Sequence, residues 1–336
     1  MTDVIVFEHV RKEYPDATVA VDDLSFAVHE HELLALVGPS GCGKSTTLRM
    51  TNRLVQLTSG RILLDGEDIT RVDAVGLRRR IGYVIQHVGL FPHRTVAQNV
   101  ATVPRLLGWD RARTRSRVGD LLELVGLDPD RYARRYPHEL SGGERQRVGV
   151  ARALATDPPV LLMDEPFGAV DPVGRRRLQV EFRRIQRELG TTVMLVTHDV
   201  DEAVRLADRV AVLSRGGHLE QLAPPVTVLS SPASPAVAEL VGTGAAVRLL
   251  TLGRLEPEDL APLTAEDVRA ADGLGAGGTR SDAVVEVGAP LDDVFAAVAR
   301  VPGGRVTVHR DGAPVGTVDA DGLVAALHRV TGPTPS

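Results

Sequence analysis

The feature that most constrains this 336-residue chain is a glycine-rich turn between an apolar run and a helical segment. Residues 38–45 read Gly-Pro-Ser-Gly-Cys-Gly-Lys-Ser, which fits the pattern G-x-x-x-x-G-K-[ST]. The preceding run, Leu33–Val37, is wholly apolar, as is typical of a strand buried on both faces of a parallel sheet. Backbone N–H groups of such a turn, together with a helix N-terminus, can cradle anionic oxygens. The turn predicts a phosphate-binding loop in an α/β fold; the alternative is a glycine-rich turn with a chance lysine.

The residue types in this loop suit ATP and Mg²⁺. We expect Lys44 to reach the terminal phosphates and the Ser45 hydroxyl to ligate Mg²⁺. Lysine occurs only at Lys12 and Lys44, which suggests a role here that arginine cannot fill. The predicted nucleotide-binding residues of the loop are Gly38, Pro39, Ser40, Gly41, Cys42, Gly43, Lys44, Ser45 and Thr46.

A second apolar run, Val160–Met163, ends in the carboxylates Asp164 and Glu165. The carboxyl ends of parallel strands are where α/β sheets bind ligands. We expect Asp164 to hold Mg²⁺, directly or through water, and Glu165 to act as the general base on the attacking water. Two adjacent carboxylates alone would equally fit a solvated loop, so this assignment depends on the phosphate loop.

Further runs complete an α/β pattern. We predict strands at 192–196 and 210–213, a helix at Arg175–Glu188 and a mostly parallel core sheet. The N-terminal stretch is better interpreted as antiparallel strands. The Arg- and Leu-rich segment Arg105–Arg135 interrupts the alternation with helical spacing, and we predict an inserted helical subdomain at about 88–158.

Composition excludes several classes. A formal net charge of −5 argues against a nucleic-acid binder held by a positive field. The single cysteine, Cys42, excludes an intrachain disulfide and fits a reducing cytoplasm. The N-terminus does not resemble a signal peptide, and no run of about 18 apolar residues occurs. We therefore expect any membrane contact to go through partners.

The stretch Leu140-Ser-Gly-Gly-Glu-Arg-Gln146 resembles the signature motif of the ABC ATPase family, a P-loop NTPase fold. Gln86, His198 and Tyr14 match the family's Q-loop glutamine, switch histidine and adenine-stacking aromatic, and Gly168–Asp171 matches its D-loop. The resemblance implies catalytic roles for Gln86 and His198, a metal role for Gln86, and nucleotide contacts for Tyr14 and Asp171. It also implies a head-to-tail dimer in which Ser141, Gly142 and Gly143 of one copy close on the ATP of the other. Tyr14 could instead be a packing residue, and His198 an ordinary strand-end histidine.

Within the family, three stretches resemble quaternary-amine uptake ATPases for glycine betaine, choline or carnitine: residues 46–69, 81–109 and 163–179. The resemblance implies an importer ATPase on the cytoplasmic face of the cell membrane, with two permease subunits and a substrate-binding protein. Residues 86–109 are expected to receive a cytoplasmic helix of the permease. Amino-acid or polyamine uptake, a soluble non-transport ABC ATPase, and a homodimer or heterodimer remain open.

Residues 245–336 form a second, acidic segment, predicted to be a small α+β domain after an ATPase domain at 1–244. The span 284–330 resembles one cystathionine-β-synthase-type (CBS) motif, with 245–280 as a degenerate copy and 273–281 as a linker. Asp319 stands where Ser or Thr is usual, and Gly322 where an Asp would meet a ribose. The alternatives are a regulatory domain and a structural or dimerising one.

Overall fold

The computed structural model describes residues 2–85, 89–168, 170–263, 284–301 and 303–332. The chain divides into two compact units. One holds residues 1–225 and 233–240, and the other holds 226–232 and 241–336. This division lies close to the predicted boundary at 244, with the short segment 226–232 added to the second unit.

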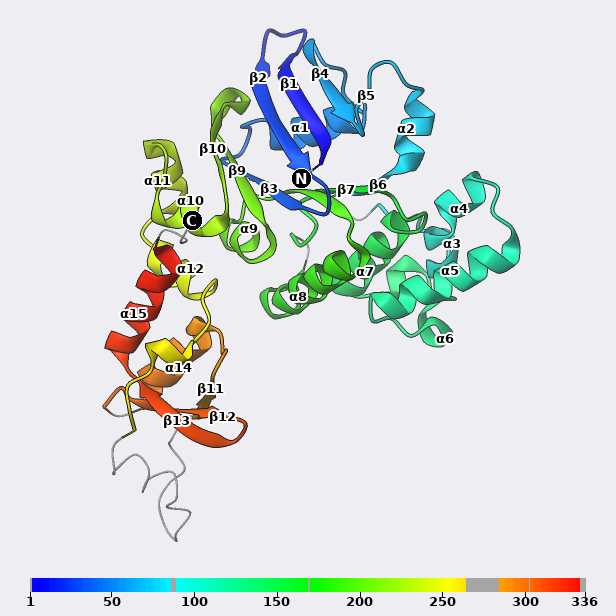
Figure 1. The fold of residues 1–336 in the computed structure, drawn as a ribbon. Coiled ribbons are helices and arrows are strands. Elements are labelled where there is room, and N and C mark those ends of the chain that lie inside the picture. Colours follow the sequence, from blue (N-terminus) through cyan, green and yellow to red (C-terminus); the bar gives the residue numbers. More distant parts are fainter. Residues whose placement is uncertain (1, 86–88, 169, 264–283, 302, 333–336) are drawn as a thin grey trace. The chain divides into compact units, whose positions relative to one another are not determined.

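A six-stranded sheet forms the centre of the first unit (Figure 1). Its order is β10 (Leu219–Ala223), β9 (Arg209–Leu213), β3 (Leu33–Val37), β8 (Thr192–Val196), β7 (Val160–Asp164) and β6 (Ile81–Val84). All neighbours pair in parallel except the edge strand β10. Every residue of β3, β7 and β8 is buried, as their continuous apolar runs predict for strands covered on both faces. The predicted mostly parallel sheet is confirmed.

The N-terminal strands form a separate antiparallel sheet, also as predicted. Its order is β2 (Val19–His29), β1 (Asp3–Glu13), β4 (Ser59–Leu64) and β5 (Glu67–Asp68). Helix α1 (Lys44–Thr51) lies between the two sheets and contacts β2, β7 and β8. Its buried Leu48 and Met50 join Phe7, whose ring stacks on Phe26 at 4.3 Å between centroids. This apolar layer fixes the start of α1 at the carboxyl end of β3.

The helices include the predicted insertion. The elements are α2 (Ala74–Arg80), α3 (Val96–Val100), α4 (Thr102–Leu106), α5 (Arg111–Leu124), α6 (Pro129–Tyr132), α7 (Gly142–Ala153), α8 (Pro172–Leu189), α9 (Val200–Leu206) and α11 (Pro235–Val241). Helix α8 begins three residues before the predicted Arg175, because the Asp171 carboxylate accepts the Gly174 N–H over 2.9 Å and caps the helix.

The second unit is a small α+β domain. It contains most of α10 (Pro225–Ser230), then α12 (Ala245–Leu250), β11 (Val284–Glu286), α14 (Leu291–Arg300), β12 (Val306–Arg310), β13 (Ala313–Val318) and α15 (Ala320–Thr331). The sheet order is β11-β12-β13, and α14 contacts α15. This is the helix–strand–strand–helix order predicted for 284–330. The CBS assignment stays a prediction, and the predicted linker 273–281 lies outside the described residues.

The two unusual residues of this domain have structural roles. Asp319 caps α15 by accepting the N–H groups of Asp321 and Gly322, both over 3.1 Å. At Gly322, a Cβ atom would lie 2.9 Å from the carbonyl oxygen of Asp259. Both positions are therefore explained by local packing, without a bound nucleotide.

Candidate functional site

The predicted phosphate loop joins β3 to α1 and depends on glycine for two reasons. Gly38 has a φ of 153°, and a Cβ there would lie 2.1 Å from the Leu213 carbonyl oxygen. Gly41 has a φ of 79°, and the space beside it is open. Gly38 therefore permits close packing, whereas Gly41 permits a left-handed turn that leaves room for a ligand. These properties fit a cradle for phosphate oxygens.

Lys44 starts α1 and lies folded over this loop. Its side chain is 6% exposed, and its ammonium donates to the carbonyl oxygens of Gly38 over 2.7 Å and Pro39 over 2.9 Å. These bonds hold the cation within the turn that is expected to receive the phosphates. The predicted position of Lys44 is thus one from which an anion could recruit its ammonium.

Ser45 and Asp164 meet although 119 residues separate them. The Ser45 hydroxyl donates to Asp164 Oδ1 over 2.8 Å, and the Arg49 guanidinium lies 3.6 Å from Oδ2. One hydroxyl and one carboxylate, completed by phosphate oxygens and water, are what a nucleotide-bound Mg²⁺ prefers. No group of three or more His, Cys, Asp and Glu side chains gathers as a metal site within the described ranges. The donor set fits Mg²⁺ held jointly with a nucleotide; the sequence did not predict Arg49.

Glu165 and His198 face one another, as their predicted roles require. His198 Nδ1 lies 3.1 Å from Glu165 Oε1. The backbone of Glu165 is in the left-handed region, with a φ of 46°, and its N–H donates to Val196 O over 2.9 Å. A non-glycine residue rarely adopts this conformation, and such residues cluster at functional sites. The carboxylate is thus oriented by a constrained turn at the ends of β7 and β8.

The signature residues form a second helix N-terminus. Ser141 caps α7 in a reciprocal box: its N–H donates to Glu144 over 2.7 Å, and its hydroxyl accepts the Glu144 N–H over 3.3 Å. The buried Tyr132 donates its hydroxyl to Glu144 Oε1 over 2.7 Å and is the main cause of a lowered pKa at that carboxyl. Gly142 and Gly143 begin the helix. The motif is therefore a preorganised helix start, a kind of site that favours anions.

The other predicted residues have different outcomes. Asp171 caps α8. Tyr14 follows β1, half-buried, with the Lys12 ammonium 4.8 Å from its ring centroid, so its contact with adenine stays a prediction. Gln86 and Ala169 of the D-loop lie outside the described residues. Thr46 is half-buried on α1.

Cys42 requires a correction. Its position at a helix N-terminus beside Lys44 predicts a reactive thiol. In the structure the Cys42 side chain is fully buried in the apolar layer that contains Leu36 and Leu48. The prediction of reactivity is wrong because the thiol turns toward the core and a reagent cannot reach it. Its backbone remains part of the loop.

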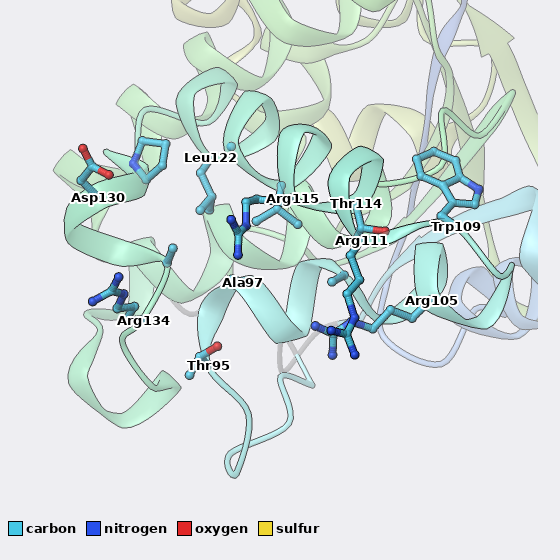
Figure 2. A pocket seen from close by; sticks show the side chains of 15 residues that line it. Thr95, Ala97, Arg105, Trp109, Arg111, Thr114, Arg115, Leu122, Asp130 and Arg134 are labelled. Atoms are coloured by element: carbon cyan, nitrogen blue, oxygen red, sulfur yellow. The ribbon is translucent and has the colours of Figure 1, made fainter.

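The helical subdomain carries two hollows. One, of about 580 Å³, includes Phe91, Arg94, Gln98 and Leu106. The other, of about 1150 Å³, lies among α3 to α6 and shares Arg105 with the first. Figure 2 shows that Arg105, Arg111, Arg115 and Arg134 border it, with Asp130 at its edge. The described part of the predicted permease-binding segment, 89–109, therefore borders a basic, hollowed surface.

Comparisons with known proteins agree with this geometry. Residues 21–168 match the family model described as ABC transporter. The glycine betaine uptake system ATP-binding protein YehX of Escherichia coli is 52% identical over 250 residues, which cover 74% of this chain and 80% of that protein. This chain belongs to the ABC transporter ATP-binding family.

Two further matches define the extent of the likeness. The osmoprotectant import ATP-binding protein OsmV of Salmonella typhimurium is 53% identical over 233 residues. That match covers 69% of this chain, but the chain spans only 61% of OsmV. A solved structure titled as a dimeric post-hydrolysis state of the ATP-binding cassette MJ0796, bound to ADP and Pi, has a TM-score of 0.59 and 31% identity. It covers 66% of this chain and 98% of its own. These likenesses support the ATPase fold.

Proposed function

We propose that this ABC protein hydrolyses ATP to drive solute import through a membrane permease. The observation that carries the proposal is the convergence of four groups at the ends of β3, β7 and β8. Ser45 and Asp164 would hold Mg²⁺ on the nucleotide, and the phosphate loop would bind the phosphates. Glu165 would accept a proton from the attacking water, while His198 contacts the Glu165 carboxylate and would orient toward the terminal phosphate.

The proposed active unit is a pair of ATPase subunits. The signature helix start is an anion site that the loop of the same copy does not need, which supports a head-to-tail arrangement in which each signature completes the partner's site. The dimeric title of the matched MJ0796 structure supports the same arrangement. A homodimer and a pairing with another ATPase subunit both satisfy this geometry.

The proposed substrate is a quaternary amine osmoprotectant such as glycine betaine, choline or carnitine. The names of YehX and OsmV support this class. Selectivity would lie in the permease and a substrate-binding protein, and uptake of an amino acid or polyamine is the alternative. The permease would place this subunit at the cytoplasmic face of the membrane. Within the described ranges, no helix has the length and apolar character to cross a bilayer.

The permease is expected to contact the helical subdomain. The hollow at Phe91 and Leu106 offers apolar contacts, and the neighbouring arginines offer charge. Phe91 is 38% exposed and Leu106 62% exposed, and exposed apolar side chains beside arginines are common at protein interfaces. This surface therefore supports docking of a partner segment.

Uptake measurements test the proposal. The chain and its permease are expressed in a bacterial strain that lacks glycine betaine uptake, and entry of labelled glycine betaine is measured at high osmolarity. The wild type should restore uptake, and Lys44→Ala should not. Uptake that Lys44→Ala leaves unchanged would contradict ATP-driven import. Intact ATPase activity without uptake of any quaternary amine would contradict the substrate assignment alone.

A further inference from the structure

The turn that carries His198 is held by a buried hydrogen-bond cluster. Thr197 follows β8 and is 1% exposed. Its hydroxyl donates to Glu202 Oε2 over 2.5 Å and accepts the Asp199 N–H over 3.0 Å. The second bond closes a short side-chain turn with His198 at its centre, a local motif open to threonine.

Backbone bonds place this turn against the other parts of the site. The Thr197 N–H donates to Leu36 O over 3.1 Å, two residues before the phosphate loop. Val196 O, on the preceding residue, accepts the Glu165 N–H. A displacement of Thr197 would therefore change the relation between His198 and Glu165.

The His198 side chain itself has little to hold it. It is 61% exposed, and its ring contacts the Glu165 carboxylate. An exposed imidazole is free to rotate unless its backbone is fixed, because few neighbours restrict its χ angles. The direction of this side chain thus depends on the turn beneath it.

Glu202 is an unusual residue to find at this place. It lies on α9 at 6% exposure, and within the described residues its Oε1 is buried without a hydrogen-bond partner. Burial of a carboxylate with one oxygen unpaired destabilises a fold. An uncharged side chain would avoid this cost, so retention of a carboxylate points to a role beyond packing.

We propose that Glu202 is a positioning residue for His198 and acts through Thr197. This inference rests on the proposed ATP hydrolysis. A threonine hydroxyl has a single proton. Because Glu202 accepts that proton, an oxygen lone pair of the hydroxyl is directed to the Asp199 N–H, and the turn presents His198 to Glu165. Without the acceptor the hydroxyl rotates, and the turn loses its closing bond.

The test is a double-mutant cycle on the full chain, with kcat measured in single turnovers and the ATP Kd measured separately. Glu202→Ala should lower kcat about tenfold, the effect of one hydrogen bond to a charged group, with an unchanged Kd. Glu202→Gln keeps an acceptor and should restore most of the rate. Thr197→Val should reproduce the loss in kcat. In a His198→Ala background, Glu202→Ala should cause no further loss, because the pathway to Glu165 is already absent.

Glu32→Gln provides a matched control. Glu32 is a buried carboxylate at the start of β3, paired with Arg209 at 2.5 Å, far along the chain from the turn. This variant should lower stability and leave kcat unchanged. A wild-type kcat in both Glu202→Ala and Thr197→Val would overturn the inference, as would an equal loss with and without His198. A wild-type chain without ATPase activity would instead contradict the proposed function, before any variant is compared.

Discussion

Glu202→Gln should change how stability depends on pH. Burial is the main cause that raises the pKa of Glu202 from 4.5 to about 7. The Asp199 carboxylate raises this pKa further, whereas the Thr197 hydrogen bond, Arg175 and His198 lower it. Because the folded state binds this proton more tightly than the unfolded state, the contribution to stability is present below pH 4.5 and is lost as pH rises to about 7.

The size of the effect follows from the two pKa values. At about 1.4 kcal/mol for each pH unit between them, the loss is about 3 kcal/mol. Glutamine carries no ionisable proton and avoids this loss. Relative to the wild type, Glu202→Gln should therefore gain about 3 kcal/mol between pH 4.5 and pH 8.

The assay is urea unfolding followed by tryptophan fluorescence. Trp109 is the single tryptophan of the chain and lies in the first unit, so its signal reports on the ATPase unit alone. Glu188→Gln, an exposed carboxylate on α8, is the control and should follow the wild type. A constant difference between Glu202→Gln and the wild type across this pH range would refute the reasoning.

Three further predictions concern other sites. Native, nucleotide-free protein should take up no maleimide in a brief reaction, because Cys42 is buried, whereas urea-unfolded protein should take up one; mass spectrometry measures both. Tyr132→Phe should destabilise the ATPase unit by about 0.5–1 kcal/mol in urea unfolding at pH 7, and less below pH 4.5, because Glu144, whose pKa is lowered, then protonates. Gly322→Asp should speed tryptic cleavage within 284–332 and give no nucleotide binding there, because its Cβ meets Asp259. Fast labelling, an undiminished difference at pH 4, or slow cleavage would contradict the respective predictions.

The sequence predicted those parts of the fold whose signals are local. The bounds of β3 and β8 agree with the apolar runs, because strands covered on both faces need apolar residues at every position. Strand β6 was missed. It contains Gly82, where a Cβ would lie 2.6 Å from the Ala153 carbonyl oxygen, so that glycine answers to a distant helix. No local pattern carries such information.

The candidate site divides in the same way. The meeting of Ser45 with Asp164 was predictable because two motifs at strand ends imply it. The contacts of Arg49 and Glu202 were not predictable, because tertiary packing decides their partners. Cys42 was misjudged because its motif defines the loop backbone but does not show which side chains turn inward.

Glu165→Gln tests the central claim most directly. The carboxylate is proposed to take the proton of the attacking water, and loss of a general base lowers a rate by about 10²–10⁴-fold. ATP turnover should fall by that factor while the ATP Kd changes little, and Mg-ATP should convert the variant to a dimer in size-exclusion chromatography. Hydrolysis by Glu165→Gln at the wild-type rate would contradict the account.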